Sequence, residues 1–154
     1  MSKAIVPAYG RAEQLADDPR VVREALRAYF AVANRWQLKT DEGRRLLGAP
    51  SESTYFTWKK KGVDSISPDT LLRISYVLGI AAFLRRLFGG APERADEWMR
   101  RPNSGPLTRG RSALEFVLDG GVVALDELHG LLESDVGSAA PVTIESAVRT
   151  SAQA

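Results

Sequence analysis

Residues 40–61 read Thr-Asp-Glu-Gly-Arg-Arg-Leu-Leu-Gly-Ala-Pro-Ser-Glu-Ser-Thr-Tyr-Phe-Thr-Trp-Lys-Lys-Lys. Thr40 is a residue type that caps helices, and Gly48 is expected to end the short helix that follows it. Ser51 is expected to begin a second helix, which stops near Gly62. A short helix, a glycine turn and a second helix make the pattern of a helix-turn-helix, and a bundle of helices is predicted around it.

The second helix of this stretch has the residue types of a DNA recognition helix. Short hydroxyl side chains near its start permit close approach to base edges, and cations on both helices can reach phosphates. The candidate DNA-binding residues are Arg44, Arg45, Ser51, Ser53, Thr54, Thr57, Lys59, Lys60 and Lys61. Trp58 and Leu47 are interpreted as core residues. Many helical bundles contain such a turn, and three lysines also occur at solvated helix ends, so an interpretation without DNA stays open.

Helical patterns continue on both sides of this stretch. Towards the N-terminus, Asp18-Pro19 predicts the start of an amphipathic helix over 19–37, with residues 1–17 as a flexible lead-in. Towards the C-terminus, Ser67-Pro68 begins a helix that Gly79 is expected to end. A further helix follows before the chain breaks at Gly89-Gly90.

Three more helices are expected beyond residue 90. Pro92 starts one that runs to Trp98, and residues 101–110 are interpreted as a loop. Ser112 and Glu115 have the spacing of a capping box, and Gly120-Gly121 closes the helix that they begin. The last amphipathic helix is predicted over 122–133.

No pair of segments reads as strands, so the predicted fold class is all-α. An N-terminal helix-turn-helix bundle is followed by a smaller helical unit. The predicted domains are a lead-in at 1–17, the helix-turn-helix domain at 18–90, a C-terminal helical domain at 91–134 and a tail at 135–154.

The composition of the 154 residues argues against several classes of function. There is no cysteine, which excludes disulfides, thiol catalysis and cysteine-based zinc sites. The single histidine, His129, argues against a histidine metal site and is expected at a surface or edge. Neither a phosphate-binding loop nor a nucleophile elbow occurs. We therefore expect no enzyme activity and no cofactor. No segment resembles a membrane span or a signal peptide, so the expected location is the cytoplasm.

Charge is divided unevenly along the chain. Residues 1–90 contain 15 Lys and Arg against 9 Asp and Glu, a net +6, whereas residues 91–154 contain 6 against 10, a net −4. A basic half favours a polyanionic partner, and an acidic half favours a different one.

Residues 95–121 carry a more distinctive pattern. Trp98 and a short basic step precede Pro102-Asn103, a glycine-containing loop follows, and Ser112-Ala-Leu114 opens a helix that ends in glycine. This segment resembles the toxin-binding domain of the MbcA/ParS/Xre antitoxins. The helix-turn-helix, with Ser67-Pro-Asp-Thr-Leu-Leu-Arg-Ile-Ser after it, likewise resembles their Xre-type domain. The two resemblances together cover about residues 20–133.

The resemblance implies a toxin–antitoxin system. Proteins of this family neutralise a RES-domain toxin, an enzyme that consumes NAD or transfers ADP-ribose from it, and they commonly repress their own operon. The implied partners are therefore a RES-domain toxin and operator DNA, and the NAD chemistry belongs to the toxin. Helix-turn-helix proteins usually read two half-sites as two-fold dimers, so a homodimer is expected.

The candidate toxin-binding residues are Trp98, Arg100, Arg101, Pro102, Asn103, Leu107, Arg109, Arg111, Leu114, Glu145 and Arg149. For Trp98, a place in the core of the C-terminal unit is favoured over a toxin contact. A nucleotide-binding toxin needs a basic pocket, which an acidic C-terminal half complements. The tail is interpreted as a plug of that pocket, with Glu145 near its basic groups and Arg149 opposite an acidic residue. The alternative is a tail without a role.

Two other functions stay open. A plain helix-turn-helix regulator without a toxin partner leaves residues 95–121 unexplained. A toxin inhibitor whose helix-turn-helix no longer binds DNA is the other alternative. Four to six phosphate contacts predict that log K falls against log salt with a slope of about −4 to −5, and a slope near zero would favour the inhibitor without DNA binding.

Overall fold

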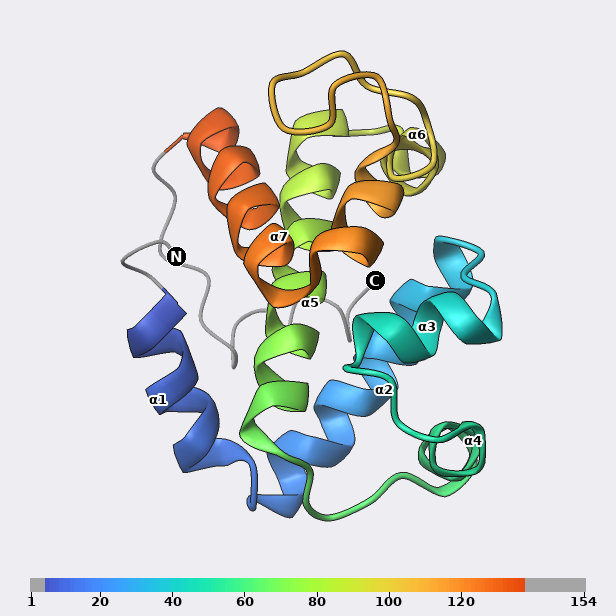
Figure 1. Cartoon of the computed structure of the whole chain (residues 1–154), viewed down its shortest axis with the longest axis vertical. Helices are drawn as coiled ribbons and strands as arrows, with labels where there is room; N and C mark the ends of the chain where they lie inside the picture. The colour runs from blue at the N-terminus through green and yellow to red at the C-terminus, as the bar shows by residue number, and fades with distance from the viewer. Residues whose placement is uncertain (1–4, 138–154) are drawn as a thin grey trace.

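The computed structural model describes residues 5–137, and this part of the chain is all-α, as predicted (Figure 1). It contains no strand, apart from one isolated bridge between Pro102 and Ser112. The helices are α1 (Ile5–Leu15), α2 (Pro19–Arg35), α3 (Thr40–Leu46), α4 (Glu52–Lys61), α5 (Pro68–Phe88), α6 (Pro92–Trp98) and α7 (Ala113–Val136).

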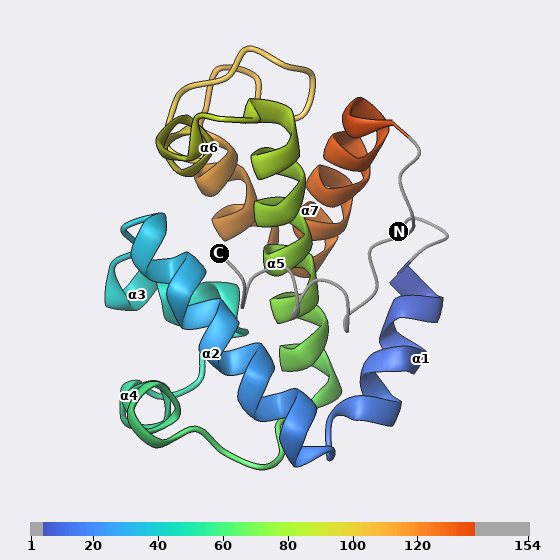
Figure 2. The same ribbon diagram turned by 180° about the vertical axis from the view of Figure 1, so that it is seen from behind.

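Helix α5 is the axis of the fold. Figures 1 and 2 show it running through the middle of the molecule, with α7 along one end and α1 and α2 at the other. Nearly every residue from Thr70 to Leu84 is buried. The predicted helix end at Gly79 is wrong, because Gly79 lies buried inside one continuous helix. A glycine in a helix interior costs only about 1 kcal/mol, which the burial of its neighbours outweighs. Gly89 ends the helix instead, with φ at 52°.

The predicted loose lead-in is also a helix over most of its length. Residues 5–15 form α1, which packs against α5. Ile5, Ala12 and Ala16 are buried at helical spacing on one face. The backbone N–H of Ile66 also donates to the carbonyl of Ala16. Pro7 fits this helix because a proline in the first turn removes no intrahelical hydrogen bond.

Helix α7 contains the predicted break. Gly121 has φ at 66°, which divides the helix into two segments. Ser112 caps the first segment by accepting a hydrogen bond from the backbone N–H of Glu115 at 3.1 Å, which is the serine half of the predicted capping box. The second segment extends to Val136 and ends at Gly137, three residues beyond the predicted end.

One buried cluster contains residues from both predicted domains. Val22 of α2, Leu78 of α5, Met99 after α6 and Leu128 of α7 all belong to it. The division at residue 90 therefore crosses a shared core in the described part of the chain, and the domain boundaries stay a prediction.

His129 lies against this core rather than at an open surface. Its side chain is 15% exposed, with its ring centroid 5.3 Å from that of Tyr76 and 5.0 Å from that of Phe83. Burial lowers the pKa of His129, although the charges of Glu133 and Asp126 oppose this effect. The fold therefore favours the neutral imidazole.

This preference predicts a loss of stability at mildly acid pH. When pH falls through the ordinary histidine value of about 6.5, the unfolded chain takes up the proton before the folded chain does. The free energy of unfolding should therefore decrease between pH 7.5 and 5. His129 is the chain's single histidine, so His129→Gln should flatten this part of the curve, as measured by thermal unfolding at each pH. Parallel curves for the two proteins would contradict the prediction.

Candidate DNA-binding and partner-binding sites

Helices α3 and α4 are held against α2 by buried contacts. The hydroxyl of Tyr29 donates a 2.7 Å hydrogen bond to the carbonyl of Gly43, inside α3. Tyr55 of α4 packs so closely on Gly43 that a Cβ there would meet its hydroxyl. Between the two helices, Gly48 and Ala49 adopt left-handed φ values of 89° and 61°. Glycine tolerates this conformation better than alanine, so the turn is built at some cost in backbone strain.

The start of α4 uses two of the predicted DNA contacts for capping. The hydroxyl of Ser51 accepts a hydrogen bond from the backbone N–H of Thr54 at 3.0 Å. It also lies 2.9 Å from the hydroxyl of Thr54, which is half-buried. These two side chains fix where the helix begins, so a role in base contact would come in addition to the cap.

Helix α4 has an inner and an outer face. Tyr55 is buried and Trp58 packs partly buried against the core, which confirms the interpretation of Trp58 and also of Leu47 in the preceding turn. The outer face presents side chains that are all exposed: Glu52, Ser53, Phe56, Thr57, Lys59, Lys60 and Lys61. Five of these seven are predicted DNA contacts. Glu52 and Phe56 were not predicted as contacts.

The two predicted phosphate contacts of α3 make bonds within the fold. Arg44 donates from Nε to the carbonyl of Pro50 at 2.9 Å and so closes the turn before α4. Arg45 donates to the carbonyl of Leu118 at 3.1 Å and lies 3.7 Å from the carboxylate of Asp119. Arg45 therefore joins the helix-turn-helix to α7, and phosphate contact by either arginine stays a prediction.

A cationic cleft of about 230 Å³ lies between α2 and the end of α4. Its α2 side, where Arg23 and Arg27 stand one turn apart, was not predicted from the sequence. Arg23 donates to Asp64 at 2.7 Å and to the carbonyl of Lys61 at 3.1 Å. Arg23 and Arg27 are spaced i, i+4 on the polar face of α2, and this spacing is a signal that could have indicated both residues. The cleft is lined by Arg23, Leu26, Arg27, Phe30, Trp58, Lys59, Lys60, Lys61 and Gly62.

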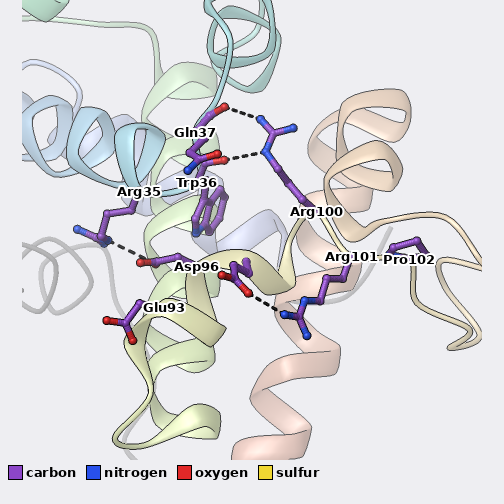
Figure 3. Close-up of a pocket in the computed structure, with 9 residues that line it drawn as sticks. Arg35, Trp36, Gln37, Glu93, Asp96, Arg100, Arg101 and Pro102 are labelled. Atoms are coloured by element: carbon purple, nitrogen blue, oxygen red, sulfur yellow. Dashed lines mark hydrogen bonds and ion pairs between the residues drawn. The ribbon is translucent and has the colours of Figure 1, made fainter.

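Arg100, a predicted toxin contact, joins α6 to the end of α2 (Figure 3). Its guanidinium donates to the carbonyl of Trp36 at 2.9 Å, to that of Gln37, and to Glu42 of α3 at 2.8 Å. Burial by itself raises the pKa of Glu42. The hydrogen bonds from the Lys39 N–H and from Arg100 outweigh burial and hold this pKa below its ordinary value. Arg100 thus pairs a cation with the carbonyl end of α2, where the helix dipole is negative.

Arg100→Ala should therefore destabilise the fold rather than only a binding surface. Three hydrogen bonds from a partly buried guanidinium predict a loss of about 1–2 kcal/mol of unfolding free energy. Arg101→Ala is the matched control, because Arg101 is 63% exposed and, within residues 5–137, pairs only with Glu97 one turn away. Urea unfolding should place the control within about 0.5 kcal/mol of wild type. Equal losses for both variants would contradict the role assigned to Arg100.

The other predicted toxin contacts that lie within the described residues fall into three groups. Leu114 is 2% exposed and Trp98 packs partly buried on the core, which agrees with the core interpretation of Trp98. Asn103 accepts a hydrogen bond from the N–H of Gly105 at 2.8 Å, which shapes the loop, and Leu107 is half-buried there. The exposed residues are Arg101, Pro102, Arg109 and Arg111, of which Arg111 pairs with Asp119. Glu145 and Arg149 lie outside the described residues.

A second cavity, of about 480 Å³, is lined by three of the predicted toxin contacts, Arg100, Arg101 and Pro102 (Figure 3). It lies between the end of α2 and α6. Inside it, Nε of Arg35 lies 3.6 Å from the carboxylate of Asp96. Burial and the positive charge of Arg85 lower the pKa of Arg35. The negative charge of Asp96 opposes this effect without cancelling it. The lining residues are Arg35, Trp36, Gln37, Glu93, Asp96, Glu97, Arg100, Arg101 and Pro102.

The described residues contain neither a metal-binding cluster nor a membrane-spanning helix. Within residues 5–137, no group of three or more histidine, aspartate or glutamate side chains is placed to hold a metal ion. Over the same residues, no helix has both the length and the apolar character that crossing a membrane requires.

The fold and the outer face of α4 define the class of this protein, which is an all-α helix-turn-helix protein. Residues 20–79, from the start of α2 to the middle of α5, match the family model of the antitoxin Xre-like helix-turn-helix domain. The chain is also 43% identical over 122 residues to the uncharacterized protein y4oB of Sinorhizobium fredii (strain NBRC 101917 / NGR234), which covers 79% of this chain and 91% of that protein. The chain therefore belongs to the same family as y4oB and carries an Xre-like helix-turn-helix of the antitoxin type.

No solved structure matches the chain significantly. The resemblance of residues 20–79 to an Xre-type antitoxin domain is confirmed. The resemblance of residues 95–121 to a toxin-binding domain stays a prediction.

Proposed function

We propose that this protein is the antitoxin of a toxin–antitoxin pair of the MbcA/ParS/Xre kind. It neutralises a RES-domain toxin by occluding the toxin's active site, and it represses its own operon through α3 and α4. It acts in the cytoplasm as a homodimer that reads two half-sites. The observation that carries the proposal is the outer face of α4, which combines short hydroxyls with lysines in a domain of the antitoxin type.

The DNA half of the proposal uses α4 and the cationic cleft together. Ser53 and Thr57 are exposed on the outer face and are short enough to let the helix approach base edges. Lys59, Lys60 and Lys61 follow at the end of the helix, and Arg27 of α2 lies across the cleft from them. Such cations neutralise backbone phosphates on one side of the groove that α4 enters.

The toxin half of the proposal uses the opposite end of the molecule. Figures 1 and 2 both place α6 and the loop after it far from α4, at the other end of the long axis. There the exposed Pro102 lines the cavity at α6, and the exposed Arg109 lies in the loop that follows α6. The net −4 of residues 91–154 favours a basic partner. Separate ends allow one molecule to hold DNA and toxin at the same time.

Co-expression with the RES-type reading frame beside its own gene tests the antitoxin function. Pull-down from these cells should recover a complex of the two chains, and cellular NAD should recover only when the full-length chain is present. A matched control carries substitutions Lys59→Gln, Lys60→Gln and Lys61→Gln on α4, which should leave toxin neutralisation unchanged. If no complex forms and NAD does not respond, the antitoxin function is wrong and the plain helix-turn-helix regulator becomes the better proposal.

A chain that ends at Gly137 tests the proposed role of the tail. Gly137 follows the last residue of α7, so this cut leaves the helix whole, whereas a cut after Ser134 would shorten it. If the tail occludes the active site, the shortened chain should still bind the toxin but inhibit it at least about tenfold more weakly, a difference of about 1.4 kcal/mol. Inhibition constants measured on the purified toxin decide the matter. Unchanged inhibition would remove the tail, with Glu145 and Arg149, from the mechanism.

A further inference from the structure

Phe56 is an exposed aromatic ring in the middle of the outer face of α4. It is 46% exposed, the highest value among the large apolar side chains that are exposed in the described part of the chain. Ser53 stands one turn before it, Thr57 follows it, and Lys60 stands one turn after it. The ring therefore occupies the centre of the face that the proposed function turns towards DNA.

Edge-to-face contacts between aromatic rings orient Phe56. Its ring lies edge-on to Tyr55, with centroids 5.8 Å apart and planes at 76°. Tyr55 lies edge-on in turn to Phe30 of α2, at 5.2 Å and 71°. Tyr55 is buried, so the exposed ring is connected through it to the core. Edge-to-face pairs of this kind are favourable, and they orient Phe56 before any partner arrives.

The chemistry of base edges decides what such a ring can recognise. In the major groove, thymine presents a C5-methyl group, whereas the other bases present hydrogen-bond donors and acceptors alone. A phenyl ring has no polar atom and packs well against a methyl group. The short side chains of Ser53 and Thr57 leave the ring free to reach the floor of the groove.

From these observations we infer that Phe56 contacts a thymine C5-methyl group in the major groove and makes α4 select thymine at one position of each half-site. This inference rests on the proposed binding of operator DNA, and it adds the base that the helix prefers. Phe56 is a specificity-determining residue in this assignment, while the lysines supply affinity that does not depend on sequence.

Deoxyuridine substitution provides the test, because uracil differs from thymine by the methyl group alone. The probe is a duplex that the full chain selects from a random-sequence pool, with each thymine replaced in turn by deoxyuridine. At one position the wild-type Kd, followed by fluorescence anisotropy, should rise about fourfold, the value expected for one buried methyl group. Phe56→Ala should bind the thymine and uracil duplexes equally. Leu87→Ala, which removes another exposed apolar side chain far from α4, should behave like wild type.

Each other result overturns the inference. If wild type binds both duplexes equally but with a strong salt dependence, DNA binding stands and the thymine contact is wrong. If Phe56→Ala remains sensitive to the methyl group, another residue reads it. If wild type binds both duplexes equally and Phe56→Ala weakens both by the same factor, Phe56 is a wedge between bases. A change in sedimentation without a change in thymine preference identifies it as a contact between protomers. If no duplex binds at low salt, both the inference and the DNA half of the proposed function fail.

Discussion

Replacing Lys59, Lys60 and Lys61 together by glutamine should remove most of the chain's affinity for DNA. Each lysine that neutralises a phosphate contributes about 0.9 to the slope of log K against log salt. Three such contacts are worth about 10²–10³-fold in Kd at 0.1 M salt. We therefore expect the slope of about −4 to −5 to weaken by about 2.7, to about −1.3 to −2.3, as measured by anisotropy titrations at several salt concentrations.

The expected effect is large because these lysines have no competing role. All three side chains are exposed, and within residues 5–137 none forms an ion pair with an acidic residue. Arg23 donates its hydrogen bond to the backbone carbonyl of Lys61, so this bond does not involve the Lys61 side chain. Their substitution should therefore leave the thermal unfolding temperature nearly unchanged.

The control changes the net charge by the same amount at the far end of the molecule. Arg86, Arg94 and Arg101 lie on or beside α5 and α6, and two of them sit over aromatic rings, at 6.0 Å from Phe83 and 5.5 Å from Phe88. Changing all three to glutamine should reduce affinity much less than the lysine substitutions do. Equal losses would mean that net charge, rather than α4, binds DNA.

Local signals in the sequence predicted many of the helix ends. Asp18 caps α2 by accepting a hydrogen bond from the N–H of Arg20 at 3.0 Å, as the Asp-Pro pair indicated. Ser51, Pro92 and Gly121 likewise mark a helix start or a break where they were expected. These signals work because a cap or a turn is decided by residues within a few positions of one another.

Distant contacts explain what the sequence did not predict. Helix α1 is a helix in the fold because α5 covers its small apolar face, and that face is too weak a pattern to stand out by itself. Gly79 continues α5 for a similar reason, since its neighbours on both sides are buried. A residue's own neighbours in sequence carry little information about such burial.

The same reason separates the predicted site residues that are exposed from those that bond within the fold. Arg45 reaches the carbonyl of Leu118, 73 positions away, and Arg100 reaches that of Trp36, 64 positions away. Both side chains look like free surface cations in the sequence. Lys59 and Lys60, at the end of α4, have no such distant partner among the described residues, and there the local pattern was sufficient to predict exposed side chains.

The other large effect is expected on stability, at a buried hydrogen-bonded pair between α5 and α7. The hydroxyl of Tyr76 donates a 3.0 Å hydrogen bond to Oδ1 of Asp126, which is 4% exposed. The second oxygen, Oδ2, is buried and has no hydrogen-bond partner within residues 5–137. Burial, and then the charge and hydrogen bond of Asp126, raise the pKa of Tyr76, so its hydroxyl remains a donor at all ordinary pH values. The Tyr76 hydroxyl is therefore the one side-chain donor to this carboxyl group in the described part of the chain.

Tyr76→Phe should consequently destabilise the fold by about 3 kcal/mol, because it leaves a buried carboxyl group with no partner on either oxygen. In a chain of this size that is a fall of roughly 6–12 °C in Tm. Combining it with Asp126→Leu should restore stability to within about 1 kcal/mol of wild type or exceed it, since this site then holds no buried polar atom without a partner. Calorimetry at pH 7.5, where His129 is neutral, measures all the variants. A single change that costs less than about 0.5 kcal/mol would mean that water reaches the carboxyl group, and a double variant as unstable as the single one would assign the loss to packing instead.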